Sequence, residues 1–221
     1  MTNGTKVVKR NGNTEPLDLN KLHKMVDEAC KDLANVSASQ VEIQSGIQFY
    51  DGVSTAEIQE ILIRSASDLI DLDHPNYQFV AARLLLFALR KQLFGRMHET
   101  PNVKSHVEKC VDRGVYDAEI LDLYDDEEFE KLESFIDHER DFIFTYAGLR
   151  QVVDKYLVQD RSTGALYETP QFMYLLIAAT IFSKYPKETR LDYVKKYYDA
   201  ISKHKINIPT PIMAGVRTPL R

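Results

Sequence analysis

The chain has 221 residues, of which 44% are hydrophobic and 28% are charged. This hydrophobic share is large enough for a packed core, which excludes an intrinsically disordered chain. The 28 Lys and Arg residues are outnumbered by 33 Asp and Glu residues. The resulting net charge of -5 excludes a nucleic-acid footprint spread over the whole surface, so any phosphate group has to bind in a local basic pocket.

Hydrophobic runs and cysteines limit the class of protein further. The longest strongly hydrophobic run, residues 173–182, is too short to cross a membrane and predicts a buried helix. The first twenty residues carry charges of both signs, unlike a signal peptide. Cys30 and Cys110 have no CxxC neighbour, which argues against a zinc site or an internal disulfide. We expect a soluble cytoplasmic protein that binds neither membrane nor nucleic acid.

The first predicted element is a β-hairpin. Residues 6–10 precede Asn11-Gly12 and residues 14–17 follow, and Asn-Gly is typical of tight hairpin turns because both residues tolerate positive φ. A two-stranded ribbon is only marginally stable alone and has to lie on something. Hydrophobic residues spaced three and four apart predict four supporting helices, over residues 19–34, 39–49, 54–70 and 77–93. A small domain over residues 5–95 follows from this pattern.

The remaining sequence predicts a second, helical part. Its hydrophobic spacing indicates helices over residues 103–113, 118–124, 126–135, 146–156, 169–184 and 186–204. A second short hairpin is predicted within residues 156–167, and the helical domain as a whole covers residues 96–205. The tail, residues 206–221, contains three prolines and predicts an extended segment without helix. The predicted fold class is therefore mainly α, with two small hairpins.

Several basic groups belong to the first domain. Lys9 and Arg10 lie beside the hairpin turn, Lys21 lies in the first turn of the first helix, and Lys91 lies near the end of the fourth. Thr55 lies in the first turn of another helix, where free backbone amides favour an anion. If the four helices bundle beneath the hairpin, these groups predict a triphosphate pocket. Spacing alone favours the simpler interpretation that they are ordinary surface residues.

The sequence gives weaker evidence for a function at other candidate residues. Thr210 lies between Pro209 and Pro211, which indicates either a fixed hydrogen-bond donor to an anion or a stiff linker, and the sequence leaves both open. The acidic run 125–130 is more typical of a solvated helix start than of a metal site. His138 has no identified partner and is interpreted as structural. We predict no catalytic residue and no metal ligand in this chain.

Two sets of motifs resemble one known family. Residues 8–12, 17–21 and 53–55 resemble the ATP-cone, a nucleotide-binding regulatory module at the N-terminus of many ribonucleotide reductases. Downstream, Phe135–Asp141 and Pro209–Pro219, together with shorter stretches, resemble the large subunit of class Ia ribonucleoside-diphosphate reductase. The resemblance runs nearly from end to end.

This resemblance implies ATP as an allosteric effector, with Mg²⁺, held by a defined set of residues. The implied effector contacts are Lys9, Arg10, Glu15, Pro16, Leu17, Asp18, Leu19, Asn20, Lys21, Thr55 and Lys91. It also implies that Thr210 contacts the substrate diphosphate at the opening of the catalytic barrel. Lysine point charges and a hydroxyl fixed by prolines suit these roles.

Three departures from the family bear on inhibition by dATP. Gln59 stands where inhibited members often have His, Glu28 where Trp is frequent, and Asp18 where Asn is common. A neutral amide supplies no cationic contact, and a carboxylate repels phosphate. We expect ATP binding to persist and dATP not to inhibit.

The family's chemistry uses a thiyl radical, a nearby cysteine pair and a partner small subunit that carries a di-iron tyrosyl radical. Neither Cys30 nor Cys110 falls at those cysteine positions, and the sequence stops at Arg221, before the barrel. We therefore expect the front part of a large subunit, from a cut chain or a split gene, which is not catalytic alone. Its expected partners are the remainder of the large subunit, the small subunit and a second large subunit.

Two rival functions compete with this interpretation. One is a helical interaction module whose cone no longer binds nucleotide. The other, a cone-bearing transcription regulator, is disfavoured because such a protein normally has a four-cysteine zinc ribbon, whereas this chain has two isolated cysteines.

Overall fold

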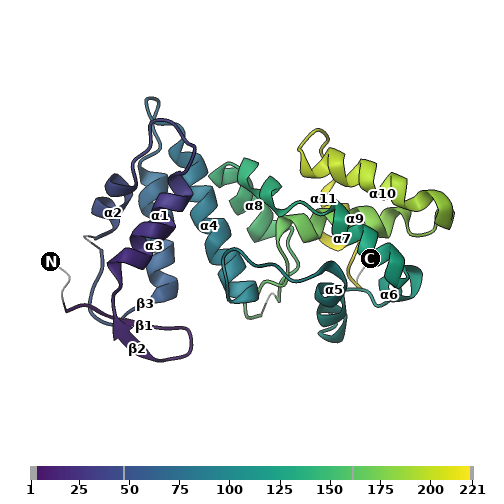
Figure 1. Cartoon of the computed structure of the whole chain (residues 1–221), viewed down its shortest axis with the longest axis horizontal. Helices are drawn as coiled ribbons and strands as arrows, with labels where there is room; N and C mark the ends of the chain where they lie inside the picture. Colours follow the sequence, from purple (N-terminus) through teal and green to yellow (C-terminus); the bar gives the residue numbers. More distant parts are fainter. Residues whose placement is uncertain (1–3, 47, 161, 220–221) are drawn as a thin grey trace. The chain divides into compact units, whose positions relative to one another are not determined.

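The computed structural model describes residues 4–46, 48–160 and 162–219, and it confirms a mainly helical fold with a small sheet (Figure 1). The strands are β1 (Lys6–Val8), β2 (Thr14–Pro16) and β3 (Val53–Ser54). The helices are α1 (Leu19–Cys30), α2 (Ala38–Gly46), α3 (Thr55–Asp68), α4 (Tyr77–Phe94), α5 (Val103–Asp112), α6 (Glu119–Leu123), α7 (Asp126–Phe135), the 3₁₀ helix η1 (His138–Ile143), α8 (Tyr146–Lys155), α9 (Pro170–Phe182), α10 (Lys187–Ser202) and α11 (Thr210–Gly215).

The chain divides into two compact units. The first comprises the chain up to Leu89 together with Phe142–Arg150, and the second comprises Arg90–Asp141 and the chain from Gln151 onward. No helix in the described part of the chain is long and hydrophobic enough to cross a membrane.

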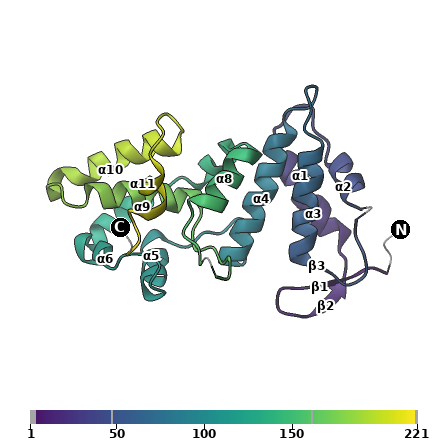
Figure 2. The same cartoon turned by 180° about the vertical axis from the view of Figure 1, so that it is seen from behind.

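A three-stranded sheet with the order β2-β1-β3 lies at one end of the helices of the first unit (Figure 2). Strand β1 pairs antiparallel with β2, with Val8 opposite Thr14. The predicted hairpin is confirmed, but its turn is not the expected two-residue Asn-Gly turn. The Lys9 amide donates to the Asn13 carbonyl at 2.8 Å, and only Gly12 has a positive φ, of 82°. This is the pattern of a three-residue loop that ends in a left-handed glycine.

The third strand was not predicted. β3 pairs parallel with β1, with Val8 opposite Ser54, and its two residues are too few to show an alternating pattern. Ser54 also forms a capping box with Glu57 at the start of α3, because its hydroxyl accepts from the Glu57 amide at 3.1 Å. The strand therefore delivers the chain directly into the start of α3.

Helices of the first unit bury the faces that the spacing predicts. Leu22, Val26 and Ala29 of α1 are buried, and Arg83 of α4 donates to the carbonyls of Ala29 and Lys31 at the end of α1. Two details of the predictions are wrong. Helix α2 begins at Ala38 and ends at Gly46, and Ile70 lies beyond the end of α3 and is 39% exposed.

The second unit is built around α9. All residues of α9 from Pro170 to Ala179 are buried, which confirms the buried helix predicted from the hydrophobic run. Helices α10 and α11 both pack against it, and α7 contacts α5 and α10. The predicted second hairpin is reduced to one antiparallel bridge between Gln159 and Leu166.

The prediction of an extended tail without helix is wrong. Residues 210–215 form α11, with Pro209 as its N-cap residue and Pro211 in its first turn. Proline fits there because the amides of the first turn have no helical acceptor and the fixed φ of proline matches the helix. The prolines start this helix, whereas the sequence pattern led us to expect that they exclude one.

Candidate functional site

The parallel pairing of β1 and β3 assembles the candidate site. Because Val8 lies opposite Ser54, the residues that follow β1 lie beside the first turn of α3. Lys9 and Arg10 follow β1 directly, and Thr55 is the first residue of α3. These three predicted residues therefore come together, in a place where the first amides of a helix favour negative charge.

The two hairpin cations are engaged with neighbouring side chains. The Lys9 Nζ atom lies 2.9 Å from Glu15 Oε1 on β2. Arg10 Nη2 donates to Gln59 Oε1 of α3 at 3.0 Å. Partial burial lowers the pKa of Arg10, although the guanidinium stays charged at neutral pH. The Arg10–Gln59 bond ties the hairpin turn to α3.

Gln59 holds an unpartnered donor beside this contact. The residue is 5% exposed, and its Nε2 atom is buried with no hydrogen-bond partner among the described residues. Buried amide donors are nearly always hydrogen-bonded in folded proteins. Gln59 thus presents a neutral N–H group next to the Arg10 cation.

Asp18 and Lys21 form the other part of the candidate site. Asp18 is the N-cap of α1, where its carboxylate accepts from the amides of Asn20 and Lys21 at 3.0 and 3.2 Å. These backbone hydrogen bonds, the Lys21 amide foremost, lower the pKa of Asp18. The Lys21 Nζ atom lies 3.6 Å from Asp18 Oδ2, and its side chain is 74% exposed. An incoming anion can therefore reach the Lys21 ammonium.

Glu15 links the two parts of the candidate site. Its pKa is lowered first by the hydrogen bond from Lys9 and further by the positive charges of Lys9 and Lys21. Both lysines therefore act on one carboxylate. Pro16 of β2 lies opposite Lys6, and the Leu17 amide donates to the Thr5 carbonyl, which holds the segment leading into α1 against β1.

Two further predicted residues lie in the second unit. Lys91 is in the last turn of α4 and is half-buried. Thr210 is the first residue of α11 and is exposed.

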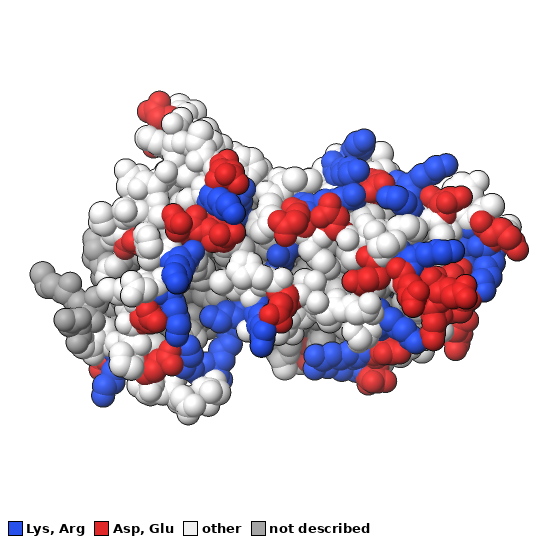
Figure 3. All heavy atoms as spheres, in the orientation of Figure 1, with Lys and Arg blue, Asp and Glu red and all other residues white. Residues whose placement is uncertain are grey.

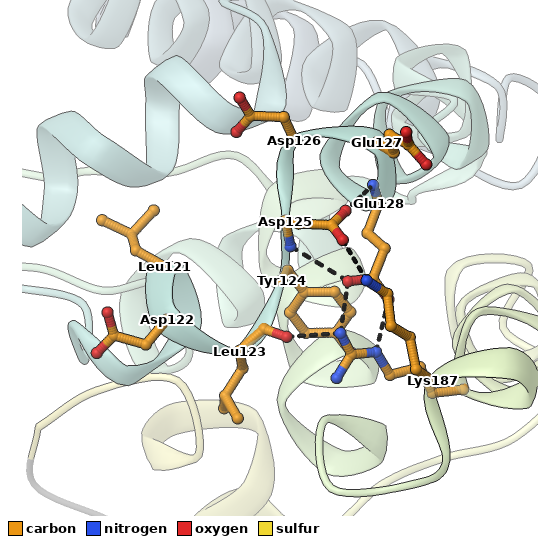
Figure 4. A pocket seen from close by; sticks show the side chains of 10 residues that line it. Leu121, Asp122, Leu123, Tyr124, Asp125, Asp126, Glu127, Glu128 and Lys187 are labelled. Carbon is orange, nitrogen blue, oxygen red and sulfur yellow. Dashed lines mark hydrogen bonds and ion pairs between the residues drawn. The ribbon is translucent and has the colours of Figure 1, made fainter.

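An acidic pocket of about 790 Å³ lies in the second unit around the start of α7 (Figure 4). Asp122, Asp125 and Asp126 line it, and Lys187 forms an ion pair with Asp125. Arg190 forms a hydrogen-bonded ion pair with the buried Glu128. Asp125 caps α7 in a capping box with Glu128, so these acids serve the helix start. No group of three potential ligands that could hold a metal ion exists among the described residues.

Besides α11, three features that bear on these sites were not predicted from the sequence. They are β3, the Arg10–Gln59 bond, and the buried ion pair between Glu168 and Arg217. The first is too short for a periodic pattern, and the other two join residues 49 positions apart in the sequence. Figure 3 shows positive and negative side chains interspersed over the face that it views, as the modest net charge suggests.

Comparisons with known proteins identify both parts of the chain. Residues 5–92 match the model of the ATP cone domain, and residues 142–221 match that of the ribonucleotide reductase all-alpha domain. The alpha subunits of ribonucleoside-diphosphate reductase 1 from Salmonella typhimurium and Escherichia coli are each 54% identical over 97% of this chain and 28% of the relative. The ribonucleoside-diphosphate reductase alpha subunit of Haemophilus influenzae is 52% identical over 100% of this chain and 29% of its own length.

This chain therefore spans less than a third of the length of these relatives. Because the two domain models match in this order along a sequence shared with these relatives, the chain belongs to the alpha subunits of class I ribonucleotide reductase, as their N-terminal ATP cone and all-alpha domain.

Proposed function

We propose that this chain is the effector-binding front of a ribonucleotide reductase large subunit, an enzyme that reduces ribonucleotides to deoxyribonucleotides in the cytoplasm. Residues 5–95 bind ATP as an allosteric effector, and residues 96–205 form a helical domain. Residues 206–221 lead toward the catalytic barrel, where Thr210 contacts the substrate diphosphate. The chain supplies no catalytic cysteine and acts with the rest of the large subunit, a second large subunit and the radical-bearing small subunit.

One observation is the main support for the proposed effector site. The pairing of β1 with β3 places Lys9 and Arg10 beside the first turn of α3, which begins at Thr55. Two cations and the free amides of a helix start are the groups that proteins use to hold phosphates. The Glu15–Lys21 segment runs from β2 into α1 and forms the other wall of the site.

Binding of ATP requires an exchange of partners. A phosphate that reaches Lys9 replaces Glu15 on the ammonium, and a phosphate that reaches Lys21 replaces Asp18. Both lysine pairs are solvent-accessible, and exposed ion pairs contribute little to stability, so a polyphosphate can displace the carboxylates. ATP arrives with Mg²⁺, which prefers phosphate and carboxylate oxygens.

We propose further that dATP does not inhibit this protein. Gln59 is neutral and its carbonyl oxygen is already bound to Arg10, so this position adds no positive charge to the site. The Asp18 carboxylate is held ionised by the amides of α1 and repels a phosphate.

The proposed effector site can be tested by removing one of its cations. Lys9→Ala is expected to weaken ATP binding by about tenfold, because a charge-assisted hydrogen bond contributes roughly 1.5–3 kcal/mol. Calorimetric titration of the 221-residue chain with MgATP measures this change.

Lys24→Ala is the matched control, because Lys24 is an exposed lysine of α1 outside the predicted site. It should leave the affinity unchanged. An unmodified chain that takes up no ATP would refute the effector site and favour a helical interaction module with an inactive cone.

A further inference from the structure

The second unit contains another pocket, separate from the acidic one. It has a volume of about 510 Å³ and lies between the end of α4, one face of α5 and residues 165–167. Pockets of roughly 300–1,000 Å³ are the size that small organic ligands occupy. No residue of the predicted effector set lines it.

The charge of this pocket is positive. Lys109 of α5 and Arg113, the C-cap residue of α5, line it, and no Asp or Glu is among the lining residues. Neither cation forms an ion pair with a described carboxylate. Lys104 on the same helix, by contrast, pairs with Asp126 at 2.7 Å. Two cations without a neutralising acid at the edge of a cavity favour an anionic ligand.

The rest of the lining is aromatic and apolar. Phe94, Leu166 and Tyr167 contribute flat or hydrophobic surface, and the Arg113 guanidinium lies over the Tyr167 ring, 5.8 Å from its centroid. Stacking on arginine and aromatic planes is how proteins hold flat rings. Gln92 adds an exposed amide that offers both a donor and an acceptor.

The wall of the pocket is fixed by buried hydrogen bonds. His106 Nε2 lies 3.2 Å from the Tyr116 hydroxyl, which donates to Glu168 Oε2 at 2.6 Å. Burial lowers the pKa of His106 to about 4, so its imidazole is neutral near pH 7. The positive charge of the pocket therefore comes from Lys109 and Arg113 and persists through the neutral pH range.

We propose that this pocket binds a small organic phosphate with a flat ring, of the nucleoside monophosphate type. Lys109 and Arg113 hold the phosphate, and Phe94 and Tyr167 contact the ring. The Gln92 amide bonds to the ring edge. This pocket and the proposed effector set share no residue.

The test uses the 221-residue chain carrying Lys9→Ala, so that the proposed effector site contributes little binding. AMP is titrated by calorimetry and by ligand-observed NMR. Replacing both Lys109 and Arg113 by glutamine is expected to weaken AMP binding by at least about tenfold, because charged hydrogen bonds are lost. Lys131→Gln, which removes an exposed cation of α7 outside the lining, should leave it unchanged.

Three further ligands and one further variant complete the test. Phenyl phosphate should compete with AMP, whereas adenosine and inorganic phosphate alone should bind at least about tenfold more weakly, because each lacks one half of the recognised chemistry. Arg113→Lys keeps the charge and removes the planar group, so it should weaken AMP more than inorganic phosphate. Equal AMP affinity in the double variant and its parent would overturn the proposal, as would no AMP binding to the parent. Neither result bears on ATP binding to the cone, which is measured with Lys9 intact.

Discussion

Glu168→Gln is expected to lower the free energy of unfolding of the second unit by about 3–5 kcal/mol, the usual effect of breaking a buried ion pair by removing one charge. Glu168 is fully buried and forms an ion pair with Arg217, whose side chain is 1% exposed. The same carboxylate accepts from the Val158 amide at 2.7 Å and from the Tyr116 hydroxyl at 2.6 Å. Glutamine replaces one acceptor oxygen by a donor that faces other donors, and it leaves the Arg217 cation uncompensated.

Urea unfolding followed by circular dichroism measures this loss. Glu130→Gln removes an exposed acid from α7 and should change the free energy of unfolding by less than about 0.5 kcal/mol. The double variant Glu168→Gln/Arg217→Met should recover part of the lost stability, because it also removes the buried Arg217 charge that would otherwise have no counter-ion. A Glu168→Gln protein as stable as its parent would show that this ion pair contributes nothing.

Asp141→Asn is expected to remove a pH dependence of stability. Asp141 is fully buried, and burial raises its pKa to about 7, only partly offset by Arg90 Nη2 at 3.5 Å and by the Gln171 amide, which donates to it at 2.9 Å. In the unfolded chain its pKa is about 3.9. A raised carboxyl pKa stabilises the folded state below about pH 4, and this stability is lost as pH rises to about 7.

At about 1.4 kcal/mol per pKa unit, the parent should lose about 4 kcal/mol relative to the Asp141→Asn variant between pH 4 and pH 7. Urea unfolding of both proteins at several pH values gives this difference, in which the titration of all other groups largely cancels. Asp112→Asn, on an exposed position of α5, should show no such divergence. Parallel stability curves for Asp141→Asn and its parent would contradict a raised pKa.

The sequence predicted those parts of the fold whose physical causes are local. The helices predicted over residues 54–70 and 77–93 correspond to α3 and α4, where Ser54 and Glu57 form a local capping box at the start of α3 and Gly95, with a φ of 78°, follows the end of α4. The short strand β3 depends on a partner 46 residues away and leaves no periodic pattern in the sequence. The prediction for residues 206–221 was wrong for a different reason. Proline disfavours the interior of a helix but suits its first turn, and the spacing of the prolines does not show which of these positions they occupy.

The candidate site was predictable only in part. Residue types identified Lys9, Arg10 and Thr55, but their proximity depends on the pairing of β1 with β3. Their effector role came from a family resemblance, and it stays a prediction. Lys109 and Arg113 were not singled out, because two cations four residues apart near the end of a helix are typical of a solvated surface. Only the packing of α4 and residues 165–167 around α5 shows that they line a cavity.

The pairing of β1 with β3 has a thermodynamic consequence. Lys9 and Thr55 are far apart along the chain and meet only when the three-stranded sheet has formed, so the unfolded chain has no partial site. Any nucleotide held there is then linked to folding by mass action, and an effector at a hundred times its dissociation constant adds about 2.7 kcal/mol to the stability of the first unit. The melting temperature of the first unit should therefore rise as the effector concentration is raised. A bound effector would in this way stabilise the unit that binds it against thermal unfolding.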